Sequence, residues 1–132
     1  MRSDLLFVYG TLKRQGHNHG FLQSAGFRGQ AQTPAGFCLL PGPGYPYLLP
    51  WEADTWVRGE LYQIPDDLWP KLDWLEDNGK EYQRHLGWFF HLASKQWLPA
   101  WVYLALNMRP EVDAHCQERI LCRDGCFDYR TS

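Results

Sequence analysis

The sequence predicts a single α+β domain spanning residues 1–132, built as a small and highly curved sheet or barrel. Strand-like segments dominate the chain, and one amphipathic helix interrupts them. Prolines and glycines keep the strands short and bent, which favours a sheet that closes on itself. No internal repeat, low-complexity segment or linker divides the chain, so one domain is expected.

The composition supports one buried core and excludes several classes of partner. The 132 residues are 45% hydrophobic and include 7 Trp. The formal net charge is −2, and charged residues are mixed along the chain, a pattern that is not typical of proteins that bind nucleic acid or anionic lipid. The first apolar run is too short for a signal peptide, and no run of about 18 apolar residues occurs. We expect a cytoplasmic protein that binds neither nucleic acid nor membrane.

The cysteines are expected to be reduced thiols in that compartment. Cys116, Cys122 and Cys126 lie close together near His115, whereas Cys38 is distant in sequence. A metal site is the alternative, but structural zinc sites usually begin with a Cys-x-x-Cys knuckle, which this sequence lacks. We therefore expect no metal and no other cofactor.

The first half of the chain alternates between strand and loop signals. Residues 5–9 form an unbroken apolar run ending at Gly10, which predicts a central strand covered on both faces. Turn-forming residues predict a loop over residues 16–20. Several prolines interrupt residues 29–49, so we expect an edge strand or an irregular wall there.

The second half begins with a strand predicted over residues 55–64. A short helix should follow, with Leu68, Leu72 and Leu75 at helical spacing and its end near Glu76.

Residues 81–92 and 96–106 then read as a hairpin. Beyond them, Pro110 is expected to begin a polar helix, followed by a short tail. The helix would carry Val112, Cys116 and Ile120.

The first candidate for chemistry is the turn Tyr9-Gly10-Thr11-Leu12. A buried strand that stops at Gly leaves consecutive backbone N–H groups without partners, and Gly permits close approach of a ligand. Such a turn can bind a carboxylate or a developing oxyanion. The alternative is an ordinary strand-to-loop turn in which Thr11 bonds its own backbone.

The second candidate is Glu76, at the end of the predicted helix, where unpaired carbonyls oppose another negative charge. Its pKa is expected to rise from about 4.3 toward 6 or 7, which would make it a competent proton carrier. The alternative is a solvated acid. His17 and His19 are expected to be surface residues, and no nucleophilic triad or phosphate-binding loop is evident.

Several segments occur in the same order along this chain as in a known protein family, and the spacing between Glu76, Tyr82 and Arg84 also matches. These segments are residues 7–14, 18–19, 57–62, 72–76 and 100–103. In this order they resemble the γ-glutamylcyclotransferase-like superfamily, especially its γ-glutamylamine cyclotransferase (AIG2-like) branch. The likeness covers residues 5 to about 106.

The resemblance implies a closed or highly curved mixed β-barrel with short flanking helices. It also implies an enzyme that converts a γ-glutamyl amide or amine into 5-oxoproline and a free amine, without a metal. Glu76 matches the family's general acid/base. The implied substrate-binding residues are Tyr9, Gly10, Thr11, Leu12 and Tyr82.

The sequence departs from the family in two places. Asp77 stands where the family usually has Gly, and its carboxylate would lift the pKa of Glu76 further or mark a drifted site. The tail from about residue 109 has no counterpart in the segments above, and self-association through it is one possibility. The alternative function is a catalytically silent module of the same fold that binds a small metabolite or a peptide.

Overall fold

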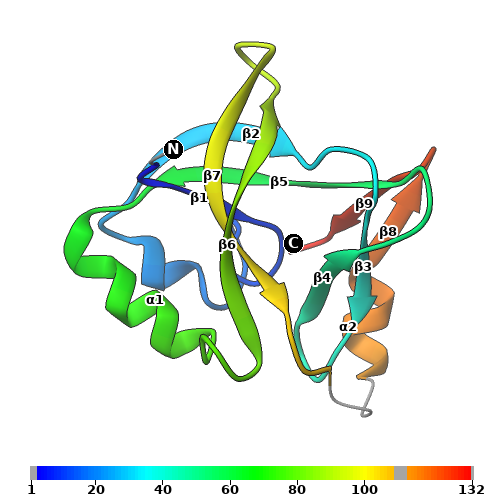
Figure 1. Ribbon diagram of the computed structural model, residues 1–132. Coiled ribbons are helices and arrows are strands. Elements are labelled where there is room, and N and C mark those ends of the chain that lie inside the picture. Colours follow the sequence, from blue (N-terminus) through cyan, green and yellow to red (C-terminus); the bar gives the residue numbers. More distant parts are fainter. Residues whose placement is uncertain (1–2, 109–112, 132) are drawn as a thin grey trace.

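A computed structural model describes residues 3–108 and 113–131 (Figure 1). Within this part, most strands form a strongly curved mixed sheet in the order β1-β7-β6-β2-β5-β9-β8, and β3 pairs separately with β4. The strands are β1 (Leu5–Val8), β2 (Gly26–Gln32), β3 (Phe37–Pro41), β4 (Pro46–Pro50), β5 (Trp56–Gln63), β6 (Tyr82–His91), β7 (Gln96–Ala105), β8 (Ile120–Arg123) and β9 (Cys126–Tyr129). The helices are α1 (Trp69–Leu75) and α2 (Ala114–Arg119), with 3-10 turns η1 (His19–Leu22) and η2 (Asp66–Leu68). The predicted α+β class is confirmed.

Strand β1 lies inside the sheet, with a neighbour on each side. It pairs antiparallel with β5, where Leu5 lies opposite Gln63, and parallel with β7, where Leu6 lies opposite Trp101. Because β5 is also connected to β7 through β2 and β6, the strand pairings run in a ring that returns to β1. The central position predicted for this strand is confirmed.

Alternate side chains of β1 enter two different apolar clusters. Leu6 and Val8 pack in the cluster that α1 covers with Leu72, whereas Phe7 packs on the opposite side with Val57. These three β1 side chains are 0–2% exposed. A strand that is buried on both faces needs apolar residues at every position, and this requirement explains the unbroken run in the sequence.

Strand β2 was not predicted. It pairs with both β5 and β6, so the expectation of an edge strand or irregular wall is wrong for the first residues of the 29–49 stretch. The strand has a bulge between Phe27 and Gly29, and Gly29 has a φ of +106°. Because this segment is polar and contains glycines, its own pattern does not indicate a strand, and its two neighbours fix its conformation.

The proline-containing strands β3 and β4 do form a small separate pair, with Phe37 opposite Pro50 and Pro41 opposite Pro46. Proline has no backbone N–H to donate to a neighbouring strand, so it is tolerated at the edge of a sheet, where no second neighbour needs that donor. The predicted hairpin is also present as β6 and β7, which pair from Tyr82–Ala105 to His91–Gln96.

The helix predicted to end near Glu76 is present. Turn η2 leads directly into α1, and Pro70 occupies the first turn, where its missing N–H costs little. Leu68 and Leu72 are buried and anchor this segment to the core. No helix in the described part of the chain is long and apolar enough to span a bilayer.

The C-terminal segment differs from its prediction. Helix α2 ends at Arg119, and Ile120 already belongs to β8, so the expected helix through Ile120 with a short tail is wrong. Pro110 and Val112 lie outside the described residues. The last residues form the β8–β9 hairpin, which joins the main sheet because β9 pairs with β5 at Val57–Phe127. The Asp124-Gly125 turn, in which both residues have a positive φ, is a local hairpin signal that the sequence analysis missed.

Candidate active site

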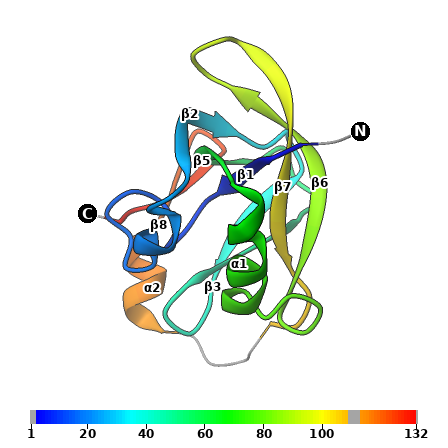
Figure 2. The ribbon, with the colours of Figure 1, turned by 90° about the vertical axis from the view of Figure 1, so that its left-hand side faces the viewer.

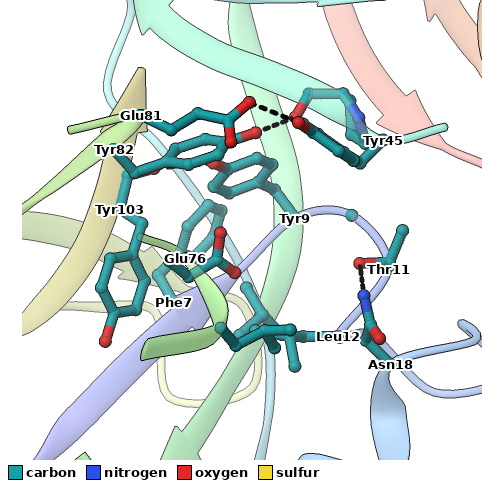
Figure 3. A pocket seen from close by; sticks show the side chains of 14 residues that line it. Phe7, Tyr9, Thr11, Leu12, Asn18, Tyr45, Glu76, Glu81, Tyr82 and Tyr103 are labelled. Atoms are coloured by element: carbon teal, nitrogen blue, oxygen red, sulfur yellow. Dashed lines mark hydrogen bonds between the residues drawn. The ribbon is translucent and has the colours of Figure 1, made fainter. Parts of the chain in front are cut away.

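A pocket of about 140 Å³ lies between the turn after β1, the end of α1 and the starts of β4 and β6 (Figure 3). It contains every residue that the sequence analysis put forward for the site. The pocket is lined by Phe7, Val8, Tyr9, Gly10, Thr11, Leu12, Asn18, Tyr45, Pro46, Leu75, Glu76, Glu81, Tyr82 and Tyr103. Glu76 and the turn at residues 9–12 are 64 or more positions apart in the chain and share this one hollow.

The turn after β1 uses its carbonyl groups internally. The Gly10 carbonyl accepts from the Lys13 N–H at 3.0 Å, and the Thr11 carbonyl accepts from the Asn18 N–H at 3.0 Å. The Leu12 carbonyl oxygen lies 2.8 Å from Nδ1 of His19. In contrast, the N–H groups of Gly10, Thr11 and Leu12 have no acceptor among the residues that the structure describes. The turn therefore has three unpaired backbone donors on residues that line the pocket.

The side chain of Thr11 does not bond its own backbone, which was the alternative for this turn. Its Oγ1 accepts a hydrogen bond from Nδ2 of Asn18 at 3.0 Å. Asn18 thus braces the turn through both its backbone and its side chain, and it lines the pocket as well. The sequence analysis included Asn18 among the family-like residues but assigned it no role.

Gly10 is required by close packing against β4. A Cβ at this position would lie 2.8 Å from Cγ of Pro46 and 3.0 Å from its Cδ. Gly16, in the same loop, is also closely packed, since a Cβ there would lie 2.2 Å from the Thr11 carbonyl oxygen. Both glycines therefore allow neighbouring protein atoms to approach the backbone more closely than a side chain would permit.

The backbone at the end of α1 fixes the position of Glu76. The N–H of Asp77 donates to the Trp74 carbonyl at 3.2 Å, and the N–H of Asn78 donates to the Asp73 carbonyl at 2.9 Å. These two bonds form a Schellman motif, in which Glu76 is the C-cap and the next residue takes a left-handed conformation. Asp77 has a φ of +49°, which explains why Gly suits this position.

The environment of Glu76 raises its pKa from 4.5 to about 7, first through burial and then through the charge of Glu81. The expected rise is therefore present, and burial, its first cause, was expected as a contribution; the charged neighbour is Glu81 and not Asp77. The second carboxylate at the pocket is Glu81, whereas Asp77 is exposed and does not line the pocket. A carboxyl group with this pKa exchanges a proton readily near neutral pH.

Phenol groups form much of the pocket wall. The Tyr9 hydroxyl donates to the Tyr103 carbonyl at 2.6 Å, and the Tyr82 hydroxyl donates to the Pro46 carbonyl at 3.1 Å. Burial raises the pKa of Tyr9, Tyr82 and Tyr103 above the ordinary value of 10.0, so these phenols stay neutral at physiological pH. The Tyr45 hydroxyl donates to Oε1 of Glu81.

Arg84 does not line the pocket. Its guanidinium group stacks on Trp69 and Trp101, with its carbon 4.5 and 5.1 Å from the ring centroids. Its Nη2 also lies 3.5 Å from Oδ2 of Asp73. Arg84 thus contributes to the packing of α1 against the sheet.

Two carboxyl groups, those of Glu76 and Glu81, line the pocket. Over residues 3–108 and 113–131, no group of three or more His, Cys, Asp or Glu side chains converges in an arrangement that could hold a metal ion. The three C-terminal cysteines are free thiols.

A protein-family model described as "Gamma-glutamyl cyclotransferase, AIG2-like" matches residues 6–125. The chain belongs to this family. The match includes the pocket and continues through α2 and β8, so it extends well beyond residue 106, where the resemblance seen in the sequence ended.

Individual relatives agree with this assignment. A Drosophila melanogaster protein classed with the γ-glutamylcyclotransferases is 35% identical over 111 residues, which cover 77% of this chain and 69% of the relative. The γ-glutamylaminecyclotransferase of Mus musculus is 36% identical over 88 residues, covering 60% of this chain and 58% of that enzyme. The crystal structure of an AIG2-like protein from Mus musculus superposes with a TM-score of 0.72 at 30% identity, covering 85% of this chain and 83% of that one.

Proposed function

We propose that this protein cyclises a γ-glutamyl amide or amine to 5-oxoproline and releases the amine, with Glu76 as general acid and base and without a metal. The observation that supports the proposal most directly is the composition of the pocket. A carboxyl group with a pKa near 7 shares it with three unpaired backbone N–H groups.

In the proposed reaction, the Glu76 carboxylate takes a proton from the α-ammonium group of the substrate. The freed α-nitrogen attacks the γ-carbonyl carbon, and a new C–N bond closes a five-membered lactam. The oxyanion formed at the γ-carbonyl is held by the N–H groups of Gly10, Thr11 and Leu12. As the carbonyl re-forms, the C–N bond to the leaving amine breaks. Glu76 carries two protons in turn from the attacking nitrogen to the leaving nitrogen, which departs as an ammonium ion.

This chemistry suits a pocket without a nucleophilic serine or cysteine. The nucleophile belongs to the substrate, and well-oriented intramolecular attack reaches effective concentrations of about 10⁵ M or more. The protein has to hold the substrate folded and to move protons. The neutral phenols Tyr9 and Tyr82 would supply a rigid wall for the aliphatic part of the γ-glutamyl group.

The mouse relative named γ-glutamylaminecyclotransferase supports γ-glutamylamines as the first substrates to test. Purified protein should be incubated with a panel of γ-glutamyl amines and γ-glutamyl dipeptides, and 5-oxoproline should be quantified. We expect turnover whose kcat/KM rises with pH through about 7, as Glu76 loses its proton. Prior dialysis against EDTA should leave the rate unchanged.

The Glu76→Gln variant keeps the shape of the side chain and removes its proton chemistry, so kcat should fall about 10²- to 10⁴-fold. Asp77→Asn is the matched control, because this neighbouring acid is exposed and lies outside the pocket lining. Product formation that survives Glu76→Gln would remove Glu76 from the mechanism. Binding of these compounds without any turnover would favour the silent binding module.

A further inference from the structure

The direction of the Glu76 side chain depends on how the last turn of α1 is held against the sheet. Helix α1 has only 7 residues, and a helix of this length needs tertiary contacts to be stable. In its last turn Leu72 is fully buried, whereas Trp74 is 77% exposed. The Schellman motif fixes Glu76 relative to the helix, but it does not fix the helix relative to the strands. A side chain that connects this turn to the sheet would therefore control where the carboxyl group points.

Asp73 makes such a connection. Its Oδ1 accepts a hydrogen bond at 2.7 Å from the hydroxyl of Tyr103 on β7, and its Oδ2 lies 3.5 Å from Nη2 of Arg84 on β6. Each carboxylate oxygen thus reaches a different strand. The backbone carbonyl of Asp73 also accepts from the Asn78 N–H in the Schellman motif, at 2.9 Å. Asp73 therefore joins the end of α1 to two strands and to the turn that follows Glu76.

Tyr103 extends this connection to the pocket wall. It lines the pocket together with Glu76, and its backbone carbonyl accepts the hydroxyl of Tyr9 at 2.6 Å. Its pKa is raised first by burial and then by the hydrogen bond to Asp73, so the phenol stays protonated and remains the donor in that bond. A hydrogen bond to a carboxylate is stronger than one between neutral groups.

We propose that Asp73 is a positioning residue, which acts through its hydrogen bond to Tyr103 to direct the Glu76 carboxyl group into the pocket. The effect on catalysis rests on the proposed function, but the placement of Glu76 can be measured without a substrate. When this bond is removed, Leu72 still anchors α1 to the core, so the fold survives. The last turn can then move away from β7, and the Glu76 carboxyl group becomes accessible to water.

The first measurement is the pKa of Glu76 in the protein without substrate. Carbon-13 NMR follows its carboxyl carbon, and the signal is assigned by its loss in Glu76→Gln. In the wild type, burial and then the charge of Glu81 raise this pKa to about 7. The phenols of Tyr9, Tyr82 and Tyr103 also interact with Glu76, and they are neutral over this pH range. The titration therefore reports chiefly the burial of the carboxyl group.

Asp73→Ala and Tyr103→Phe each remove the hydrogen bond, so each should lower the pKa of Glu76 to below about 6 as water reaches the carboxyl group. Asp73→Asn removes the charge but keeps an oxygen that can accept from Tyr103, so it should leave the pKa near the wild-type value. Asp67→Ala is the matched control, because Asp67 is an exposed acid in η2, directly before α1. Equal decreases in Asp73→Asn and Asp73→Ala, or in Asp67→Ala and Asp73→Ala, would overturn the inference.

The second measurement is the rate of 5-oxoproline formation from a γ-glutamyl amine. Asp73→Ala and Tyr103→Phe should each lower kcat about tenfold and change KM less than about threefold, because the turn that binds the substrate is unaltered. Asp73→Asn should restore kcat to within about threefold of the wild type. The double variant Asp73→Ala, Tyr103→Phe should lose no more than either single variant, since both changes remove the same bond. Reduced stability with unchanged kcat and an unchanged pKa of Glu76 would show a merely structural role and overturn the inference.

Together the two measurements separate this inference from the proposed function. If the wild-type protein forms no 5-oxoproline, but Asp73→Ala lowers the pKa of Glu76 and Asp73→Asn does not, the reaction is refuted and the positioning stands. If 5-oxoproline forms, and neither Asp73→Ala nor Tyr103→Phe changes kcat or this pKa, the positioning is refuted and the reaction stands.

Discussion

Individual residues of the pocket have environments that change their ordinary chemistry. Glu76 is half-buried near a second carboxylate, and the pKa of its carboxyl group rises to about 7. Tyr9 and Tyr82 are buried phenols that donate to backbone carbonyls and stay protonated. Gly10 is pressed against Pro46. Two stability measurements follow from these environments and do not depend on any substrate.

The raised pKa of Glu76 predicts a pH-dependent loss of stability. The folded protein binds this proton up to about pH 7, whereas the unfolded chain releases it near 4.5. The stabilising effect of protonation is therefore complete below about 4.5 and is lost as the pH rises through about 7. We expect Glu76→Gln to be more stable than the wild type by roughly 1–3 kcal/mol at pH 8 and about equal at pH 4.5. Urea unfolding at both pH values measures this, and the same difference at both would contradict it.

Gly10→Ala should destabilise the fold, because the new Cβ would lie 2.8 Å from Cγ of Pro46. Overpacking of this kind costs about 1–3 kcal/mol in the free energy of unfolding. Gly20→Ala is the control, since a Cβ there has no atom within 4 Å, and it should change stability by less than about 0.5 kcal/mol. Denaturant unfolding compares the two variants, and similar effects would argue against the contact with Pro46.

Among the secondary-structure elements, α1 shows most clearly how a local motif serves the pocket. Its C-terminal Schellman motif orients the Glu76 side chain, and the motif requires a left-handed residue immediately afterwards. The Gly that the family resemblance leads us to expect at that position would meet this requirement without strain. Asp77 meets it with some strain.

Asp77→Gly should therefore stabilise the protein. Gly relieves the left-handed strain at φ +49°, although it also increases the entropy of the unfolded chain. The expected net gain is about 0.5–1 kcal/mol in the free energy of unfolding. Asp77→Ala is the comparison, because it removes the charge and keeps a Cβ, and it should be no more stable than the wild type. A gain in both variants would point to the charge of Asp77 instead.

In the molecule as a whole, the C-terminal hairpin supports the turn that forms the pocket floor. Figure 2 shows the chain end beside the loop that follows β1. Nζ of Lys13 lies 2.7 Å from Oδ1 of Asp128 on β9, and the Thr131 hydroxyl donates to the Arg14 carbonyl at 2.7 Å. Glu60 on β5 accepts from the Arg14 N–H at 2.9 Å. The loop is thus held to the sheet and to the last strand.

Asp128→Asn should loosen this arrangement. It leaves the largely buried ammonium group of Lys13, whose side chain is 10% exposed, without its ion-pair partner. Because Asp128 is itself 46% exposed, the expected cost is only about 1 kcal/mol of stability, with a severalfold fall in any 5-oxoproline formation. Asp124→Asn makes the same chemical change at an exposed position of the same hairpin and should have little effect. Equal losses in the two variants would contradict the support proposed for Lys13.

Much of the fold could be predicted because several elements carry their own pattern. The apolar run of β1, the leucine spacing of α1 and the paired aromatic strands β6 and β7 identify these elements locally. Strand β2 has no such signal, because a polar segment with glycines becomes a strand only where neighbouring strands supply hydrogen bonds. The β8–β9 hairpin does have one, the Asp124-Gly125 turn between apolar residues, which the sequence analysis missed.

The candidate site shows the same division. Residue types and chain order were sufficient to select Glu76 and the Tyr9–Leu12 turn as candidates, and the family resemblance added Tyr82. Folding was needed to bring Glu81 and Tyr45 to the same pocket and to place Arg84 outside it. A short segment reveals its own periodicity and turns, but the burial of a charge and the identity of its neighbours depend on contacts between residues far apart in the chain.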